Sequence, residues 1–331
     1  MTGNEIVVII AAYNAADTID RAIQSALIQP EVAEVIVIDD ASQDDTVRVA
    51  NASGGSDSRL RVISQTINSG PSAARNAAIR ESSSPLISIL DADDMFLPGR
   101  FTQLLQTKDW DFVADNILFC RDLRELDDLD QVLNQDLGLQ NFTVDLGVAE
   151  FIAGNISKRG RQRGELGFLK PVMRRSFLEA HNLTYSEDCR LGEDFLLYSQ
   201  GLLKGGRLRL IGKCGYVALI RPNSLSGGHS VKDLRDLYTS VRAQTQNTDY
   251  SESLLAVMKK HLSSIERRLR HREVLQTKSE KGLFFGLSLA LRHPSTLIGI
   301  LRDKFLVKPP PAPTPRLLFH VDDIVGQFRP D

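Results

Sequence analysis

The segment from Pro85 to Leu90 is a mostly apolar run that ends directly in Asp91, Asp93 and Asp94. Short apolar runs bounded by turn formers are typical of buried strands in a parallel sheet. Carboxylates after such a strand lie at the edge where open α/β sheets bind their ligands. Crowded carboxylates need a cation or a proton for balance, and a hard divalent ion carrying a diphosphate suits oxygen ligands. A plain acidic turn at the surface is the alternative interpretation.

Three earlier apolar runs, at residues 6–12, 35–38 and 60–63, predict further strands. Helical spacing follows the first run, Ser42 and Asp45 are spaced as a capping box for a second helix, and Pro71 suits the start of a third. Repeated strand–helix units imply a parallel sheet with right-handed crossovers and helices on both faces. We therefore expect an α/β fold for about the first hundred residues.

Length and composition set broad limits on the class of protein. The 331 residues are 42% hydrophobic and 25% charged, so the chain can bury a sizeable core, and its net charge of -2 gives no general attraction to nucleic acid. Three cysteines without CxxC spacing imply neither a disulfide framework nor a zinc site and fit a reducing compartment. No cation precedes the first apolar run, and no stretch reaches the ~18 apolar residues of a membrane span. We therefore expect a cytoplasmic protein.

Beyond residue 110 the alternation of strands and helices loosens. A strand is expected at 111–115, a helix at 171–182, and mostly helical structure from about Val231 onward. These changes predict three regions, with boundaries near residues 110 and 230.

The last region is strongly basic between Lys259 and Lys308, where twelve Lys and Arg residues face only four acids. Within it lies the apolar segment Gly282 to Leu291. An apolar surface beside cations is the pattern of a helix that lies on an anionic membrane. A basic helix that only covers the core fits the same sequence, and both interpretations stay open.

Polar residues follow each of the four predicted strands, so they converge on one edge of the sheet. Tyr13, Asp40 and Arg75 belong to the first three groups, and Asp91 to Asp94 form the fourth. An aromatic ring can cover a base, a carboxylate can accept from its ring N–H, an arginine can assist the nucleotide, and the final carboxylates can hold ribose and metal. A packed ring at Tyr13 and a helix cap at Asp40 are the plainer interpretations of each residue alone. Their joint placement favours a nucleotide site.

At this point the chain resembles a known family, the family 2 glycosyltransferases with the GT-A fold. The matching segments are Ile9-Ile-Ala-Ala-Tyr-Asn14, Val35-Ile-Val-Ile-Asp-Asp-Ala-Ser42, Asn68-Ser-Gly-Pro-Ser-Ala-Ala-Arg-Asn76 and Leu90-Asp-Ala-Asp-Asp94. Together they cover about the first hundred residues and are highly specific in combination. The family usually has proline where Ala12 stands.

The resemblance implies a UDP-sugar as donor and a divalent metal, Mn²⁺ or Mg²⁺. It implies that Tyr13 and Asp40 contact the uracil, that Asp91 lies near the ribose, and that Asp93 ligates the metal within the D-x-D motif. Asp94 would support either of the last two roles. In these terms residues 1–110 are the nucleotide-sugar-binding half of the GT-A domain and residues 111–230 its acceptor-binding half. Residues 231–331 are a helical, basic region that associates with the membrane in one of the two interpretations above.

In the second half, Glu193-Asp194 within the segment Glu187 to Leu197 resembles the acceptor-side "ED" motif of the family. An inverting transferase needs one carboxylate to take the proton of the acceptor hydroxyl. We assign this base to Asp194, with Glu193 orienting it or binding acceptor hydroxyls. The alternative is a dipole-matching pair of acids at a helix start.

The segment from Arg221 to Ser226, followed by His229, resembles the part of the family after its last strand. His229 is a candidate ligand of the metal or diphosphate, against the plainer interpretation of a histidine in a polar loop. The sole tryptophan is Trp110, so the Q-x-x-R-W motif of processive synthases is absent and transfer of a single sugar is favoured. Neither a G-x-G-x-x-G after the first strand nor a P-loop is present.

The chain as a whole most resembles bacterial exopolysaccharide glucosyltransferases of the succinoglycan type. This implies glucose transfer from UDP-glucose to a growing lipid-diphosphate-linked oligosaccharide, at the inner face of the cytoplasmic membrane. Two other function classes stay open. A nucleotidyltransferase has a related fold but carries a glycine- and lysine-rich phosphate loop where Tyr13 to Asp17 stand here. A non-catalytic nucleotide-sugar or glycan-binding module would keep the pocket without turnover.

Overall fold

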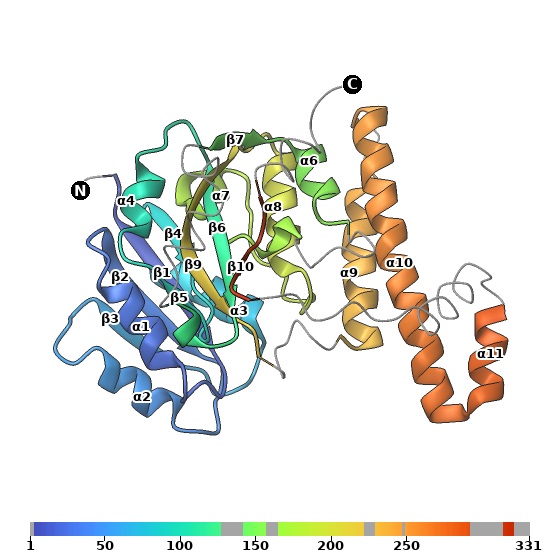
Figure 1. Cartoon of the computed structure of the whole chain (residues 1–331), viewed down its shortest axis with the longest axis horizontal. Helices are drawn as coiled ribbons and strands as arrows, with labels where there is room; N and C mark the ends of the chain where they lie inside the picture. Colours follow the sequence, from blue (N-terminus) through green and yellow to red (C-terminus); the bar gives the residue numbers. More distant parts are fainter. Residues whose placement is uncertain are drawn as a thin grey trace.

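The computed structural model describes residues 3–126, 142–156, 165–221, 229–246, 249–291 and 314–320, and the structural statements below concern these residues. One mixed sheet lies at the centre of the molecule (Figure 1). Its strands are β1 (Ile6–Ala12), β2 (Val32–Asp39), β3 (Leu60–Ser64), β4 (Leu86–Ile89), β5 (Met95–Phe96), β6 (Phe112–Cys120), β7 (Thr143–Leu146), β8 (Val172–Arg174), β9 (Leu208–Leu219) and β10 (Arg316–Leu317). The helices are α1 (Ile19–Leu27), α2 (Thr46–Ser53), α3 (Pro71–Glu81), α4 (Arg100–Leu105), α6 (Val148–Ala153), α7 (Arg175–Ala180), α8 (Glu193–Leu203), α9 (Val231–Gln244), α10 (Glu252–Lys281) and α11 (Leu283–Leu291).

The first four strands form the parallel sheet that the sequence predicts. Their order is β3-β2-β1-β4, and each neighbouring pair is parallel. The residues from Ile6 to Ile10 are fully buried, as is usual for a parallel strand covered on both faces. Because these strands run in one direction, the segments that follow β1, β2 and β4 meet at a single edge.

The predicted helix at 171–182 is wrong in its first part. Val172 to Arg174 form β8, and only Arg175 to Ala180 are helical. β8 pairs antiparallel with β4 on one side and with β6 on the other, and Val172 and Met173 are fully buried between them. Hydrogen bonding in the centre of the sheet therefore overrides the helical pattern of this segment.

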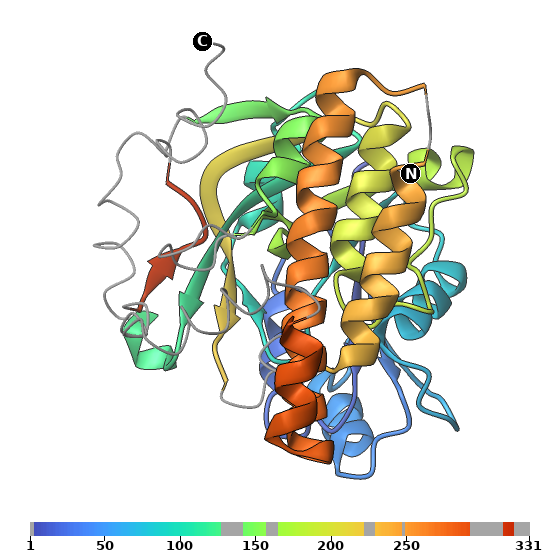
Figure 2. The same ribbon diagram turned by 90° about the vertical axis from the view of Figure 1, so that its right-hand side faces the viewer.

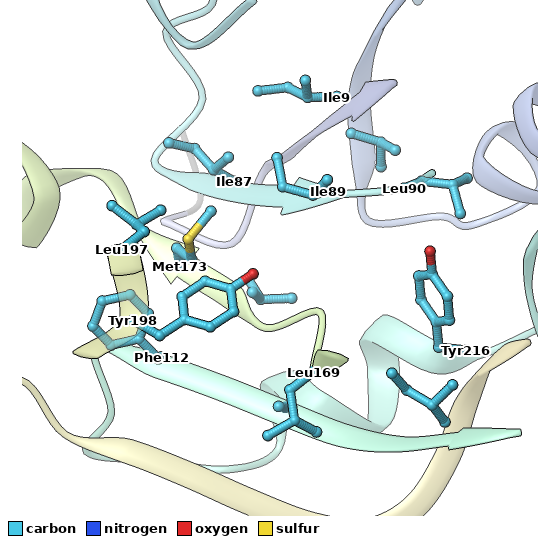
Figure 3. Close-up of a cluster of buried hydrophobic side chains, with 14 of the residues drawn as sticks. Ile9, Ile87, Ile89, Leu90, Phe112, Leu169, Met173, Leu197, Tyr198 and Tyr216 are labelled. Carbon is cyan, nitrogen blue, oxygen red and sulfur yellow. The ribbon is translucent and has the colours of Figure 1, made fainter. Parts of the chain in front are cut away.

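The sheet continues without a break into the second half of the chain. From β8 the order is β6, β9 and β5, with β6 and β9 parallel. The predicted strand at 111–115 is thus the start of the longer β6. The buried apolar side chains of both halves form one core, in which Ile9, Ile89 and Met173 lie close together (Figure 3).

The predicted capping box of the second helix does not form. α2 begins at Thr46, and the side chain of its N-cap residue Asp45 makes no capping bond, whereas Asp44 Oδ1 accepts from the N–H of Thr46 at 3.0 Å. The Ser42 hydroxyl instead accepts from the backbone N–H of Asn14 at 2.9 Å, and Asn14 Oδ1 accepts from the N–H of Gln43 at 2.8 Å. These two bonds tie the loop after β1 to the loop after β2.

The region from Val231 to Leu291 is mostly helical, as predicted, with α9, α10 and α11 joined by short non-helical segments among the described residues. α9 begins with a capping box between Ser230 and Asp233. α10 packs beside α9 and α6, and α11 folds back along its end (Figures 1 and 2). No helix in the described ranges combines the length and apolar character needed to cross a membrane.

Candidate active site

Tyr13 and Asp40 stand at the edge of the sheet, after β1 and β2. Tyr13 is 49% exposed, so its ring is uncovered and can receive a ligand. Asp40 is buried, and its two carboxylate oxygens accept from the backbone N–H groups of Ser69 at 2.8 Å and Gly70 at 2.7 Å. Gly70 has a φ of 90°, a conformation that favours glycine. Asp40 therefore fixes the turn that leads into α3, at the same edge as Tyr13.

Arg75, on α3, lies inside the site rather than at its surface. Its guanidinium donates to Asp91 Oδ1 and to Glu193 Oε1, each at 2.9 Å, and lies 3.6 Å from Asp194 Oδ1. Its side chain is only 5% exposed. Arg75 thus joins the carboxylate after β4 to the two carboxylates at the start of α8, which are more than a hundred residues further along the chain.

Lys170, just before β8, makes a second connection between the same two groups. Its ammonium lies 2.7 Å from Asp194 Oδ2 and 2.9 Å from Asp91 Oδ2. Burial acts to lower the pKa of Lys170, but Asp194 and Asp91 raise it well above its usual value, so the side chain stays charged. Burial acts to raise the pKa of Asp91, whereas Lys170 and Arg75 hold it at about 2.

Glu193 and Asp194 are the first two residues of α8, after Gly192 with a φ of 74°. Asp194 is buried, and its Oδ1 has no hydrogen-bond partner among the described residues. Burial and the neighbouring Asp194 raise the pKa of Glu193, against the pull of Arg75. The carboxylates of Asp91, Glu193 and Asp194 thus share two cations, and Asp194 Oδ1 makes no hydrogen bond to either of them.

The three acids after β4 have different surroundings. Asp94 is buried, and its oxygens accept from the Tyr216 hydroxyl at 2.7 Å and from the Leu219 N–H at 3.0 Å. Asp93 is about one-third exposed and lies 3.7 Å from the Arg221 guanidinium, while Arg21 donates to its backbone carbonyl at 2.9 Å. Burial and the charge of Asp91 raise the pKa of Asp93. Asp93 is about as exposed as Asp91, but Asp91 is hydrogen-bonded to Arg75 and lies 2.9 Å from Lys170, so the charge of Asp93 is the less fully balanced of the two.

His229 lies directly before the capping box of α9 and is half-buried. No cluster of three or more His, Cys, Asp or Glu side chains able to hold a metal occurs within the described ranges. The carboxylates that lie nearest one another in the active site are already paired with cations. A metal held by Asp93 would therefore need most of its remaining ligands from the bound substrate and from water, as is common for Mg²⁺ in nucleotide sites.

Sequence reasoning brought most of the site together but missed Lys170 and Tyr216. Lys170 stands alone beside Pro171 in a segment with a helical pattern, and Tyr216 lies within an ordinary apolar strand. Lys170 and Tyr216 reach their partners only because β8 and β9 pair with strands that are distant in the sequence. Nothing local in the sequence signals those contacts.

The comparisons with known proteins agree with this geometry. The model of the glycosyl transferase family 2 matches residues 7–156. Over 307 residues the chain is 46% identical to the succinoglycan biosynthesis protein ExoU of Rhizobium meliloti, covering 91% of this chain and 88% of that protein. The chain belongs to glycosyltransferase family 2.

This glycosyltransferase is also 35% identical over 226 residues to the succinoglycan biosynthesis protein ExoO of Rhizobium meliloti, covering 67% of this chain and 62% of that protein. Among solved structures it is similar to S. aureus TarS 1-349 in complex with UDP-GlcNAc, with a TM-score of 0.60 and 16% identity over 88% of this chain and 92% of that one. It is also similar to the mannosyltransferase PcManGT from Pyrobaculum calidifontis in complex with GDP-Man and Mn²⁺, with a TM-score of 0.52 and 17% identity over 91% and 87% of the two chains.

At these identities the structural likenesses show the fold alone, and they confirm the predicted GT-A fold with a helical C-terminal region. Membership of the family decides among the three function classes that the sequence leaves open. The glycosyltransferase is an enzyme, not a nucleotidyltransferase or a binding module.

Proposed function

We propose that this glycosyltransferase transfers one glucose, with inversion, from UDP-glucose to a growing lipid-diphosphate-linked oligosaccharide in exopolysaccharide biosynthesis. Two relatives named as succinoglycan biosynthesis proteins support the pathway. The main support for the reaction comes from the contacts of the two carboxylate oxygens of Asp194. One of its oxygens is held by Lys170, and the other is buried without a hydrogen-bond partner among the described residues.

In this proposal Asp194 is the general base. The acceptor hydroxyl donates to Asp194 Oδ1 and gives up its proton as its oxygen attacks the anomeric carbon of the donor sugar. The bond from that carbon to the diphosphate breaks, and UDP leaves with the electron pair. Glu193 orients the site through its bond to Arg75 at 2.9 Å, because that bond fixes the start of α8 against α3. The proton taken by Asp194 cancels the single negative charge in excess.

The donor nucleotide occupies the sheet edge after β1, β2 and β4. We assign the exposed ring of Tyr13 and the fixed carboxylate of Asp40 to the uracil, and Asp91 to the ribose. The contacts of Arg75 favour an indirect part in nucleotide binding, through the orientation of Asp91. The contacts of Asp94 likewise favour a supporting part, through the anchoring of β9.

We assign the metal, Mn²⁺ or Mg²⁺, to Asp93 together with diphosphate oxygens, and retain His229 as a candidate ligand. The raised pKa and partial exposure of Asp93 support this assignment, since its charge calls for a cation. Once bound there, a divalent cation would offset the charge that develops on the diphosphate as UDP leaves.

We assign one role to each predicted region. Residues 1–110 bind the donor, residues 111–230 bind the acceptor, and residues 231–331 bind the membrane surface. On α11 the side chains of Leu283, Phe284 and Phe285 are 55–79% exposed, and the neighbouring Lys278 and Lys281 are exposed as well. Apolar side chains beside cations suit an anionic membrane, where a lipid-linked acceptor would be found. We therefore propose peripheral attachment at the inner face of the cytoplasmic membrane.

Calorimetric titration with UDP, with and without Mn²⁺, tests the donor assignment, with GDP and CDP as controls. Transfer from UDP-glucose to a lipid-diphosphate-linked acceptor is then compared between the wild type and Asp194→Asn. We expect metal-dependent UDP binding in both proteins and loss of at least about 100-fold in turnover for the variant. Wild-type turnover in Asp194→Asn would overturn the assignment of the base, and preference for another nucleotide would overturn the donor.

A further inference from the structure

Lys170 is the one lysine that the structure places between the donor-side and the acceptor-side carboxylates of the described site. Its side chain is 8% exposed, and its ammonium contacts Asp194 Oδ2 at 2.7 Å and Asp91 Oδ2 at 2.9 Å. Removing an ammonium from water is costly unless it is paired and hydrogen-bonded. Two carboxylates at these distances meet that condition, so the position of the ammonium is tightly defined.

The backbone on either side holds Lys170 in place. The preceding Leu169 is fully buried in the core (Figure 3). The carbonyl oxygen of Lys170 accepts from the Arg100 guanidinium at 2.6 Å, and Arg100 is itself paired with Asp115 at 2.7 Å. Arg100 and Asp115 are both buried. The stem of Lys170 therefore starts from a fixed point, and the fold specifies where its charge lies.

We infer that Lys170 is a positioning residue for the transfer reaction: it holds Asp194 by Oδ2 so that Oδ1 faces the acceptor, and it ties the base to the donor-side Asp91. This inference rests on the proposed function, because it takes Asp194 as the base. Lys170 does not touch the reacting atoms in this scheme. It acts through the two carboxylates, as the third member of a triad orients a base.

The charges around Lys170 give the inference a measurable consequence. The charged groups around Lys170 are Arg75, Asp91, Glu193 and Asp194. Asp93, which is paired with Arg221, and the buried Tyr185 also lie within range of its charge. With Lys170 present, the carboxylates exceed the cations by one charge. Without it the excess is two negative charges beside Asp194 and Asp91. Loss of Lys170 therefore moves the lower limb of the pH profile of kcat/KM upward, an effect that a purely structural lysine would not have.

The test compares Lys170→Met with the wild type and with Lys204→Met, a control at an exposed lysine on the surface. Circular dichroism and UDP titration first establish folding and donor binding. We expect UDP affinity within about threefold, kcat lower by about 100-fold, and a lower limb displaced upward by about one pH unit. In Asp194→Asn, adding Lys170→Met should cost little more, since residues that act as a unit are non-additive.

Several results would contradict a positioning role for Lys170. Turnover and pH profile equal to the wild type in folded Lys170→Met would overturn the inference, as would full additivity with Asp194→Asn. Lys170→Gln, which keeps a hydrogen-bond donor but no charge, is the second variant if Lys170→Met does not fold. Failure of both to fold would assign Lys170 to stability and would also overturn the positioning role. Wild-type protein that transfers no sugar from any nucleotide donor would instead overturn the proposed function.

Discussion

The hydroxyl of Tyr216 donates to Asp94 Oδ2 at 2.7 Å and so joins β9 to the acidic turn after β4. The same hydroxyl accepts from the backbone N–H of Asp91 at 3.2 Å. Figure 3 shows the ring of Tyr216 with its hydroxyl directed toward the end of the strand that carries Ile89 and Leu90. Burial, followed by the charges of Asp91 and Asp93, raises the pKa of Asp94 well above its usual value. Through its bonds to Tyr216 and Leu219, Asp94 holds the acidic turn against β9.

Tyr216→Phe removes the hydrogen bond from the hydroxyl of Tyr216 to Asp94 without changing the shape of the ring. The variant leaves Asp94 Oδ2 buried without its donor, so we expect the free energy of unfolding to fall by about 1–3 kcal/mol. Urea denaturation measures the change, and Tyr238→Phe, at a half-buried tyrosine on α9, is the matched control. Equal stability of Tyr216→Phe and the wild type would show that this bond contributes nothing to the fold.

Asp93→Ala tests the metal assignment. We expect the variant to fold and to lose the Mn²⁺-dependent part of its UDP affinity, because the carboxylate of Asp93 is partly exposed and lies no closer than 3.7 Å to the Arg221 guanidinium. Titration with UDP in the presence of Mn²⁺ or of a chelator provides the measurement. Asp188→Ala, at an exposed acid outside the turn, should behave as the wild type. A metal dependence that survives in Asp93→Ala would place the cation elsewhere.

Arg75→Met tests the cation that bridges the two halves of the site. The variant leaves the partly buried carboxylates of Asp91 and Glu193 with one cation fewer, so we expect a loss of about 3 kcal/mol in stability, the low end for a broken buried ion pair. Adding Glu193→Gln should restore part of that loss, since it removes one of the uncompensated charges. Denaturant titration of the single and double variants gives the coupling between them. Purely additive effects would contradict a shared ion pair.

His261 predicts a pH dependence of stability. Burial, followed by the charge of Arg268, lowers its pKa from 6.5 to about 4, and its ring packs 4.6 Å from that of Phe195. Between about pH 4 and pH 6.5 the imidazole of His261 therefore binds a proton in the unfolded chain but not in the folded protein. The free energy of unfolding should fall as pH drops from about 6.5 to about 4, by up to about 3 kcal/mol.

Thermal unfolding at several pH values checks this contribution in His261→Phe, which keeps a ring but cannot titrate. The decline in stability below about pH 6.5 should be shallower in that variant than in the wild type. His181→Phe, at a half-buried histidine against Phe177, is the control. An identical slope in His261→Phe would remove His261 as the cause.

The proposed membrane surface is tested by replacing Phe284 and Phe285 with serine. Their side chains are 79% and 55% exposed, so the double variant should fold normally. We expect its binding to vesicles that contain phosphatidylglycerol to weaken by about tenfold or more, since two large apolar side chains no longer enter the lipid. Vesicles of phosphatidylcholine alone control for charge. Equal binding of variant and wild type to the anionic vesicles would favour a helix that only covers the core.

The sequence was sufficient for the parallel half of the fold because its signals are local. The buried runs from Ile6 and Leu86 and the acids that follow Leu90 depend on neighbours along the chain. The same is true of Glu193 and Asp194, which stand together at the start of one helix.

What the sequence could not supply are contacts made across the sheet. Lys170 meets Asp194 only because β8 is inserted between β4 and β6, and that pairing overrides a helical pattern. Arg75 was predicted near the nucleotide, yet the carboxylates that surround it include Glu193 from the far half of the chain. Long-range ion pairs of this kind depend on the finished topology.

The direct pairing of β4 with β8 has a consequence for how product leaves the enzyme. Hydrogen bonds between these strands tie the segment just before the donor-side acids to the segment just after Lys170, so we expect the two sides of the reaction centre to move together. We therefore expect release of the proposed product, UDP, to depend on loops at the rim. Sequence changes there can alter turnover or sugar preference over evolutionary time while the charged centre stays as it is.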